Sequence, residues 1–306
     1  MTGNNLALWK DTLIKKSILD FVERITDKES KDHIPEEERI AVFDNDGTLW
    51  TEQPLQVELF YALDRAKELA EINPALNNSP IFKAFLEMDL KSLVTFSKND
   101  IINLLFQTHD GKSPEEFMGF VKKWFDTAIH PKFNFSYYNS SFKPQIELLN
   151  FLRSNGFKTF IVSGGGIDFM RTIGNKMYGI PENQIIGSSG KTKIEYNDNV
   201  PEIVRVPKLN SFDDKDEKIN NIHLHTGKRP VFAFGNSDGD LAMLRYTLGG
   251  KNLNMALLLH HDDDVREVAY DKDFKISPLN LALEVADKEG IKVVSMKNDW
   301  MEVFNS

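Results

Sequence analysis

The stretch Ile-Ala-Val-Phe-Asp-Asn-Asp-Gly-Thr, residues 40–48, decides the fold of this protein. Its first four residues are apolar and β-prone, which predicts a short buried strand. That strand runs directly into Asp44 and Asp46, so two acidic side chains lie at its end. Gly47 permits a backbone geometry that other residues resist. We therefore expect the chain to turn here, with Asp44 facing a substrate and Asp46 reaching a leaving group.

Further apolar runs along the chain are expected to form the other strands of a sheet. They are residues 159–162, 184–186, 231–234 and 255–259. Helical patterns such as 144–155 and 166–179 mostly separate them, and continuous apolar strands that alternate with helices predict a parallel sheet covered on both faces. The predicted fold class is therefore α/β, with a three-layer Rossmann-like parallel sheet as its core.

Polar, glycine-rich turns follow three of these strands. They are DNDGT at 44–48, SGGG at 163–166 and GNSDGD at 235–240. Ligands of such sheets bind beyond the carboxyl ends of the strands. We therefore expect the three turns to converge on one site.

Residues 52–135 contain no comparable strand run and are rich in helical patterns. We interpret them as a helical cap, inserted after the first strand, that excludes water from the site. The catalytic core is then formed by residues 1–51 together with 136–306. Residues 190–206 alternate around Asn197-Asp198-Asn199 and predict a β-hairpin.

The composition limits the partners. A formal charge of −9 and a pI of about 5.4 argue against unaided binding to nucleic acid. An acidic protein that handles a phosphate anion must cancel charge locally, with a metal ion or a few placed cations. Because the chain has no cysteine, thiolate metal sites and thiol nucleophiles are excluded.

The N-terminal region has no basic segment followed by an apolar stretch and a small-residue cleavage site, and no apolar run reaches ~18 residues. We therefore expect a cytoplasmic protein with no membrane partner. A periplasmic location is the alternative if a leader has been removed. The oligomeric state is not readable from the sequence.

Two carboxylates at the end of a buried strand suit phosphoryl transfer. A carboxylate such as Asp44 can act as a nucleophile and form an aspartyl-phosphate. A second carboxyl group, here Asp46, can protonate the leaving oxygen and then activate water. The simpler alternative is a solvated acidic turn, since turns rich in Asp, Asn and Gly are common.

The order of the motifs weighs against that alternative. DNDGT, Ser163 after an apolar strand, a later lysine and GNSDGD resemble the four motifs of the haloacid dehalogenase superfamily. The helical insertion after the first motif is most similar to the phosphoserine-phosphatase-like branch. The resemblance implies Mg²⁺ held by Asp44, the backbone carbonyl of Asp46 and acids of the last motif. It also implies that Ser163 and the amide of Gly164 bind a phosphate oxygen.

The last motif departs from the family pattern. Asn236 stands where the family has its first aspartate, and Asp240 occupies the position of the second acid. An amide oxygen can still ligate Mg²⁺, with less charge. Asp238 lies between them and is a candidate to supply the missing charge, directly or through water.

The family also places a lysine ahead of the last motif to neutralise the nucleophile and the phosphate. The candidates are Lys208, Lys215 and Lys218. We favour Lys218 because it opens the helical stretch that leads to Val231.

An acid at position 46 favours phosphate ester hydrolysis, because members of the superfamily with other chemistries lack it. The sequence thus predicts a Mg²⁺-dependent phosphatase that acts on a small phosphomonoester through an aspartyl-phosphate. A phosphotransferase is one alternative. A non-catalytic protein that binds phosphate or metal is another, and Asn236 gives it some weight.

The run His260-His261-Asp262-Asp263-Asp264 looks like a metal cluster, but contiguous residues point in different directions. We do not expect it to bind metal. Because it follows an apolar strand, a supporting role near the site stays open.

Overall fold

The computed structural model describes residues 6–93, 95–107 and 113–304. One seven-stranded sheet forms its centre, in the order β4-β3-β2-β1-β5-β6-β7. The strands are β1 (Ile40–Phe43), β2 (Lys158–Gly166), β3 (Ile185–Asn197), β4 (Val200–Ser211), β5 (Phe232–Gly235), β6 (Met255–His260) and β7 (Lys292–Ser295). All neighbours pair in parallel except β3 and β4, which pair antiparallel.

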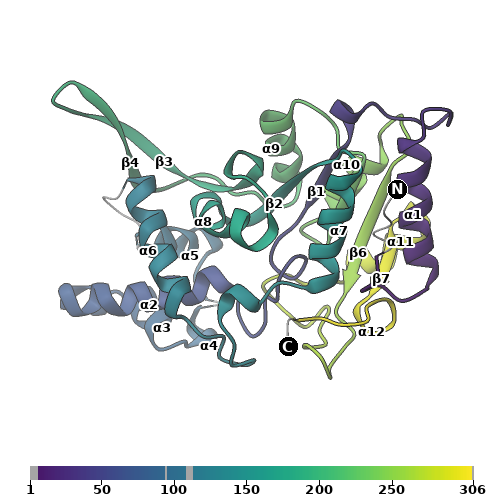
Figure 1. Ribbon diagram of the computed structural model, residues 1–306. Helices are drawn as coiled ribbons and strands as arrows, with labels where there is room; N and C mark the ends of the chain where they lie inside the picture. The colour runs from purple at the N-terminus through teal and green to yellow at the C-terminus, as the bar shows by residue number, and fades with distance from the viewer. Residues whose placement is uncertain (1–5, 94, 108–112, 305–306) are drawn as a thin grey trace.

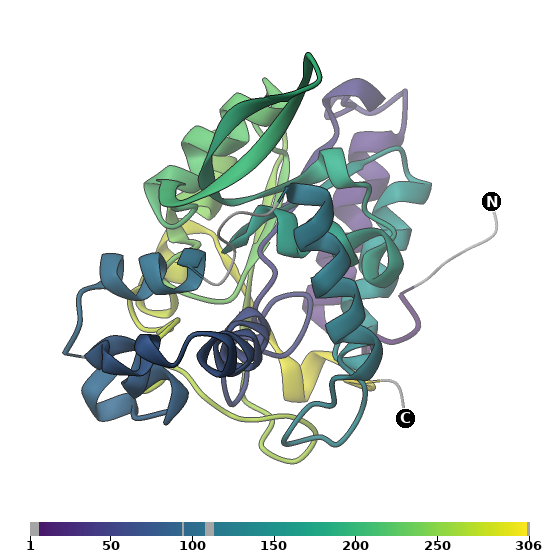
Figure 2. The same cartoon turned by 90° about the vertical axis from the view of Figure 1, so that its left-hand side faces the viewer.

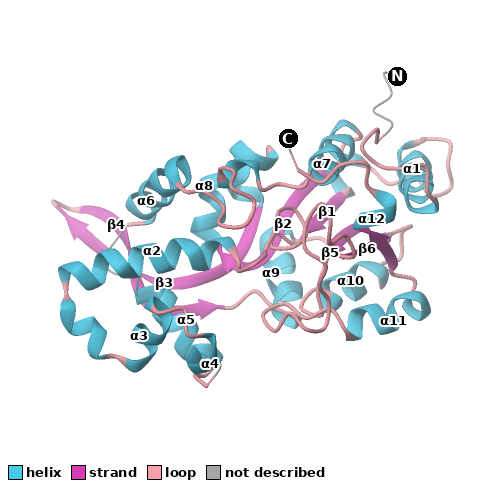
Figure 3. Ribbon diagram, turned by 90° about the horizontal axis from the view of Figure 1, so that it is seen from below, coloured by secondary structure: helices cyan, strands magenta, loops and turns pink. Residues whose placement is uncertain are grey.

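The helices of the core cover both faces of the sheet (Figure 3). They are α1 (Leu13–Thr26), α7 (Lys143–Ser154), α8 (Ile167–Tyr178), α9 (Asp216–Thr226), α10 (Leu241–Leu248), α11 (Leu281–Glu289) and α12 (Met296–Asp299). Alternate residues of β1 separate the two faces. Ala41 and Phe43 pack with α1, α7 and α8, whereas Ile40 and Val42 pack with α9, α10 and α11. The three-layer α/β fold predicted from the sequence is therefore confirmed.

Helices α2 to α6 leave the core after the first strand and gather at one end of the molecule, far from α1 and α11 (Figure 1). They are α2 (Val57–Ile72), α3 (Pro80–Leu86), α4 (Leu90–Leu93), α5 (Lys98–Gln107) and α6 (Pro114–Thr127). A small apolar cluster that includes Leu63, Phe82 and Phe85 holds α2 and α3 together. In contrast, Phe117 and Phe125 of α6 belong to the main core. The helices expected to form the cap, α2 to α6, therefore contact the core through α6.

The predicted hairpin is present as β3 and β4, which project from the body beside the cap (Figure 2). Its turn consists of Asp198 and Asn199, whose φ values are +48° and +66°. Two successive positive φ values match the type I′ turn that fits the twist of a hairpin. At its base, the Arg205 guanidinium lies 4.1 Å from the Phe117 ring centroid, so the hairpin also contacts the cap.

The apolar pattern missed one strand. β7 is a four-residue edge strand, Lys-Val-Val-Ser, in which only Val294 is buried. An edge strand this short gives a weak periodic signal. Among the described residues, no helix is long and apolar enough to cross a membrane.

Candidate active site

The turn after β1 is fixed by its backbone. The Asp44 amide donates to the Phe234 carbonyl of β5 at 2.9 Å, and the Gly47 amide donates to the Trp50 carbonyl at 2.9 Å. Gly47 has a φ of +76°, and a Cβ atom there would lie 2.0 Å from Asn236 Nδ2. Position 47 therefore requires glycine both for its dihedral angle and for space.

The carboxyl group of Asp46 reaches the glycine loop at the end of β2. Its Oδ1 accepts a hydrogen bond of 2.9 Å from the indole Nε1 of Trp50. Its Oδ2 lies 3.6 Å from the position that a Cβ of Gly165 would take. Burial raises the pKa of Asp46 to about 6, although the Trp50 hydrogen bond opposes this shift. Such a pKa suits a group that must both donate and accept a proton near neutral pH.

Lys218, in the first turn of α9, joins two acids from different strands. Its Nζ donates to Asp44 Oδ1 at 2.7 Å, to Asp240 Oδ1 at 2.6 Å and to the Val162 carbonyl at 2.8 Å. These three acceptors match the three protons of the ammonium group. Burial alone would lower the pKa of Lys218, but the carboxylates of Asp240 and Asp44 raise it overall. The lysine therefore stays charged inside the site.

The other two candidate lysines lie elsewhere. Lys208 and Lys215 are both exposed, whereas Lys218 is only 3% exposed. Of the three candidates, Lys218 is thus the one that the fold brings to Asp44. Its catalytic role remains a prediction.

Asp240 organises the turn after β5. Its Oδ2 accepts the backbone amides of Asn236 and Ser237, both at 3.0 Å, and the Ser237 hydroxyl at 3.2 Å. Its Oδ1 accepts from Lys218. These contacts make Asp240 a residue that holds the turn and the lysine in place. Direct metal ligation by Asp240 remains a prediction.

Asp238 lies beside the start of α11. Its carboxylate accepts the amides of Asn280, Leu281 and Ala282 at 3.1, 3.2 and 2.8 Å. These are amides at the start of α11, so Asp238 caps that helix. Its carboxylate is thus engaged with α11, and the suggestion that it supplies the charge that Asn236 lacks remains a prediction.

Two side-chain oxygens that could hold a metal ion face a common hydroxyl group. Thr48 Oγ1 lies 3.1 Å from Asn236 Oδ1 and 3.4 Å from Asp44 Oδ2. Carboxylate and amide oxygens of this kind are the ligands that Mg²⁺ uses. The described residues contain no group of three or more acids or histidines that could hold a metal, so the donors here would include an amide.

The charge balance of the site also fits a cation. Lys218 is the one ammonium group that contacts Asp44 among the described residues. The carboxyl groups that interact with it exceed its single positive charge; they are the buried Asp44, Asp213 and Asp240 and the partly exposed Asp46. Unbalanced buried carboxylates are costly. A divalent cation beside Asp44 and Asn236 would therefore reduce the excess negative charge.

The glycine loop, SGGG at 163–166, forms the end of β2 and leads directly into the first turn of α8. Ser163 is buried, and its Oγ accepts the Gly165 amide at 3.1 Å. Ser188 of β3 donates its hydroxyl to the Gly164 carbonyl at 2.7 Å and so fixes the loop from the neighbouring strand. The loop thus holds the Ser163 hydroxyl close to the start of a helix, where anions are favoured.

Glu58 is a site residue that the sequence analysis missed. It lies in the first turn of α2, and its Oε2 accepts the Gly166 amide at 2.6 Å. Burial raises its pKa to about 7, against the opposing effect of the Gly166 hydrogen bond. The available signal was a single acid in the otherwise apolar start of the cap, Val-Glu-Leu-Phe at 57–60.

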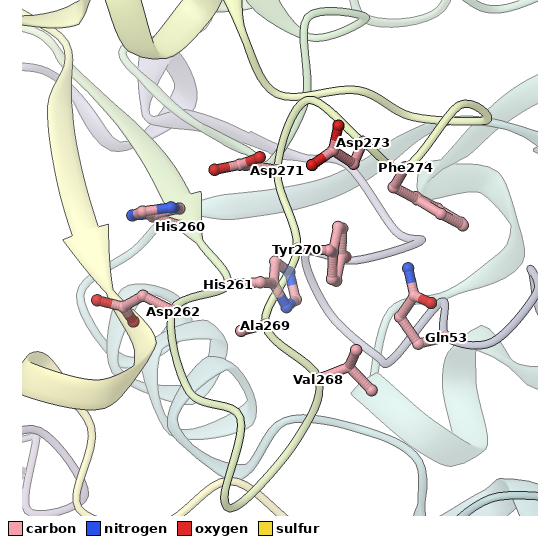
Figure 4. Close-up of a pocket in the computed structure, with 10 residues that line it drawn as sticks. All are labelled: Gln53, His260, His261, Asp262, Val268, Ala269, Tyr270, Asp271, Asp273 and Phe274. Carbon is pink, nitrogen blue, oxygen red and sulfur yellow. The ribbon is translucent and has the colours of Figure 1, made fainter.

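His261 supports the first turn from behind. Its Nε2 lies 2.7 Å from the Gly47 carbonyl, which can only accept, so Nε2 donates. Its Nδ1 lies 3.2 Å from Glu267 Oε2, and its ring stacks on Tyr270 with centroids 4.3 Å apart. Both rings line a pocket behind the turn, opposite Gln53 (Figure 4). The supporting role left open for the His260–Asp264 run therefore belongs to His261.

A carboxylate pair at the end of a central parallel strand, with a buried lysine and a glycine loop, defines an α/β enzyme with its site at the carboxyl edge of the sheet. The chain belongs to the haloacid dehalogenase-like hydrolase family, whose sequence profile matches residues 41–245. The family assignment made from the motifs is therefore confirmed.

Solved structures share the fold at low sequence identity. A conserved protein of unknown function from Anaerococcus prevotii DSM 20548 is 15% identical, with a TM-score of 0.57 over 96% of this chain and 94% of that chain. A protein of unknown function from Bordetella pertussis Tohama I is 14% identical, with a TM-score of 0.54 over 84% and 98%. A phosphoserine phosphohydrolase-like protein from Francisella tularensis is 16% identical, with a TM-score of 0.41 over 82% and 99%. No curated protein matches this chain in sequence.

Proposed function

We propose that this hydrolase is a Mg²⁺-dependent phosphatase that acts on a small phosphomonoester through an aspartyl-phosphate on Asp44. The observation that carries the proposal is the buried contact of 2.7 Å between Lys218 Nζ and Asp44 Oδ1. Asp44 lies two residues before Asp46 in the chain. A charged lysine on the nucleophile offsets the repulsion between a carboxylate and a phosphate dianion.

The two acids have different roles in the reaction. A carboxylate oxygen of Asp44 attacks phosphorus while the bond from phosphorus to the ester oxygen breaks, and Asp46 gives its proton to that oxygen. Asp46, now ionised, then takes a proton from the water that attacks phosphorus, and the bond from phosphorus to the Asp44 oxygen breaks. Inorganic phosphate leaves, and both acids return to their starting states.

Other residues of the site would bind and orient the phosphoryl group. Ser163 and the amide of Gly164 would donate hydrogen bonds to a phosphate oxygen at the start of α8. Asp44, the Asp46 carbonyl, Asn236 and Asp240 would hold Mg²⁺. When bound, Mg²⁺ supplies positive charge to the phosphate oxygens and so favours attack by an anion.

The cap favours a small substrate. Glu58 of α2 reaches the glycine loop and accepts the Gly166 amide at 2.6 Å, so the cap lies directly against the phosphate-binding loop. A covered site excludes water that would compete with the leaving-group alcohol for Asp46.

The test is phosphate release from a panel of phosphomonoesters with and without Mg²⁺. The intact protein is compared with Asp44→Asn, and Asp264→Asn serves as a matched control because Asp264 is exposed. We expect metal-dependent release that is lost in Asp44→Asn and retained in the control. Release that persists in Asp44→Asn would rule out the covalent mechanism, and phosphate transfer to an added alcohol would identify a phosphotransferase.

A further inference from the structure

Glu52 is a buried acid that the motifs do not include. It is 0% exposed, and both of its carboxylate oxygens have donors. Oε1 accepts from Asn236 Nδ2 at 2.9 Å and from the Tyr270 hydroxyl at 2.7 Å, and Oε2 accepts from the Ser277 hydroxyl at 2.5 Å. Burial raises the pKa of Glu52, and the hydrogen bonds from Ser277 and Tyr270 oppose that rise. The three donors hold the Glu52 carboxyl group in one position beside Asn236.

The contact with Glu52 determines which way the Asn236 amide faces. Glu52 Oε1 accepts from Asn236 Nδ2, so the NH₂ end of the amide points at Glu52. The oxygen end then points the other way, toward Thr48 Oγ1 at 3.1 Å. That hydroxyl also neighbours Asp44 Oδ2. If the amide were reversed, its NH₂ group would occupy the position of the candidate metal ligand.

We propose that Glu52 is a positioning residue that orients the Asn236 amide so that its oxygen is available for metal binding. The inference rests on the proposed Mg²⁺-dependent function.

The first turn is built around this pair. A Cβ atom at Gly47 would lie 2.0 Å from Asn236 Nδ2 and 2.5 Å from Glu52 Oε1. The pair therefore packs directly against the backbone between Asp46 and Thr48. Because the space is filled, the amide cannot turn without displacing the turn that carries Asp46.

The pairing predicts that aspartate, the usual residue of the family at position 236, would weaken metal binding in this protein. Asn236→Asp would place two carboxyl groups at the 2.9 Å spacing that the present hydrogen bond occupies. Two carboxyl groups at that distance cannot both be ionised without strong repulsion. The double variant Glu52→Gln with Asn236→Asp restores a complementary pair. In it the new amide at position 52 can donate to the new carboxylate at position 236, and the Tyr270 hydroxyl can donate to the amide oxygen.

The test measures Mg²⁺ and Mn²⁺ binding by isothermal titration calorimetry, without substrate, together with the melting temperature. The four proteins are the wild type, Glu52→Gln, Asn236→Asp and the double variant. We expect each single variant to bind metal about 10- to 100-fold more weakly, the usual effect of losing a residue that orients a ligand. The double variant should return to within about threefold of the wild type.

A milder variant separates the loss of metal binding from a loss of folding. Tyr270→Phe keeps the ring that stacks on His261 but removes one donor to Glu52. It should weaken metal binding in the same direction with little change in melting temperature, while Asp264→Asn should leave binding unchanged.

The outcomes separate the two proposals. Tighter metal binding by Asn236→Asp alone, or additive losses in the double variant, would overturn the role of Glu52 and leave the phosphatase proposal intact. The expected binding pattern in a protein that releases no phosphate would support Glu52 and reject the phosphatase. A wild-type protein that binds neither metal would overturn both.

Discussion

Glu58 Oε2 lies 2.6 Å from the backbone nitrogen of Gly166, and these residues are 108 positions apart in the chain. This hydrogen bond joins the first cap helix to the loop that follows Ser163. A hydrogen bond from an amide to an ionised carboxylate is stronger than one between neutral groups. The hydrogen bond therefore opposes the rise in the Glu58 pKa that burial causes.

The pKa of Glu58 predicts a specific pH dependence of stability. Burial raises this pKa from 4.5 to about 7, so the folded protein keeps the proton to higher pH than the unfolded chain does. The contribution of Glu58 to folding is therefore favourable at low pH and declines as the pH rises toward about 7. In Glu58→Gln that decline is absent. The melting temperature of the variant, relative to the wild type, should rise between about pH 5 and 8.

The control for that measurement is Glu284→Gln, which alters an exposed acid of α11. Its melting temperature should follow that of the wild type across the same range. A constant difference between Glu58→Gln and the wild type at every pH would contradict the assignment of a raised pKa to Glu58.

Lys218→Met should damage both stability and activity. It leaves Asp44 and Asp240 close together in a buried site without their shared cation. Removal of one partner of a buried ion pair typically costs about 3–5 kcal/mol of unfolding free energy. Urea unfolding measures this loss, and phosphate release should fall by at least about 100-fold. The exposed Lys215, changed to Met, is the matched control, and equal losses in both variants would argue against a special role for Lys218.

Gly47→Ala should lower the unfolding free energy more than a glycine substitution that only strains the backbone. Gly47 and Gly227 have φ values of +76° and +65°, but an added Cβ meets close atoms only at Gly47. Gly227→Ala should cost about 1–2 kcal/mol for the left-handed conformation alone. Gly47→Ala should cost more and should also weaken Mg²⁺ binding, because Asn236 must move. Equal unfolding free energies and unchanged metal binding would count against the packing argument.

Asp46→Asn should have an effect that depends on the leaving group. Loss of a general acid slows the release of a poor leaving group by about 10²- to 10⁴-fold. A nitrophenolate needs no proton to leave, so hydrolysis of p-nitrophenyl phosphate should suffer much less in its first step. Measurements of kcat/KM for an alkyl phosphate and for p-nitrophenyl phosphate test this difference. Equal losses for both would indicate that Asp46 does not protonate the leaving oxygen.

The sequence by itself determined the strand at 40–43, the turn that follows it and the order of the three polar turns. These features depend on local patterns, because a buried strand needs a continuous apolar run and a sharp turn needs glycine. The prediction that acids meet a glycine loop also followed, since parallel strands end at one edge of the sheet. Family membership then rested on motif order.

Only the tertiary structure decided which polar side chains meet across long separations. The sequence favoured Lys218 over Lys208 and Lys215 only through its place at the start of a helical stretch. Burial beside Asp44 distinguishes it in the structure. Glu52 contacts Asn236 across 184 positions, a pairing with no local pattern. Contacts of this kind arise from how helices and loops pack on the sheet, and packing depends on the whole chain rather than on any one segment.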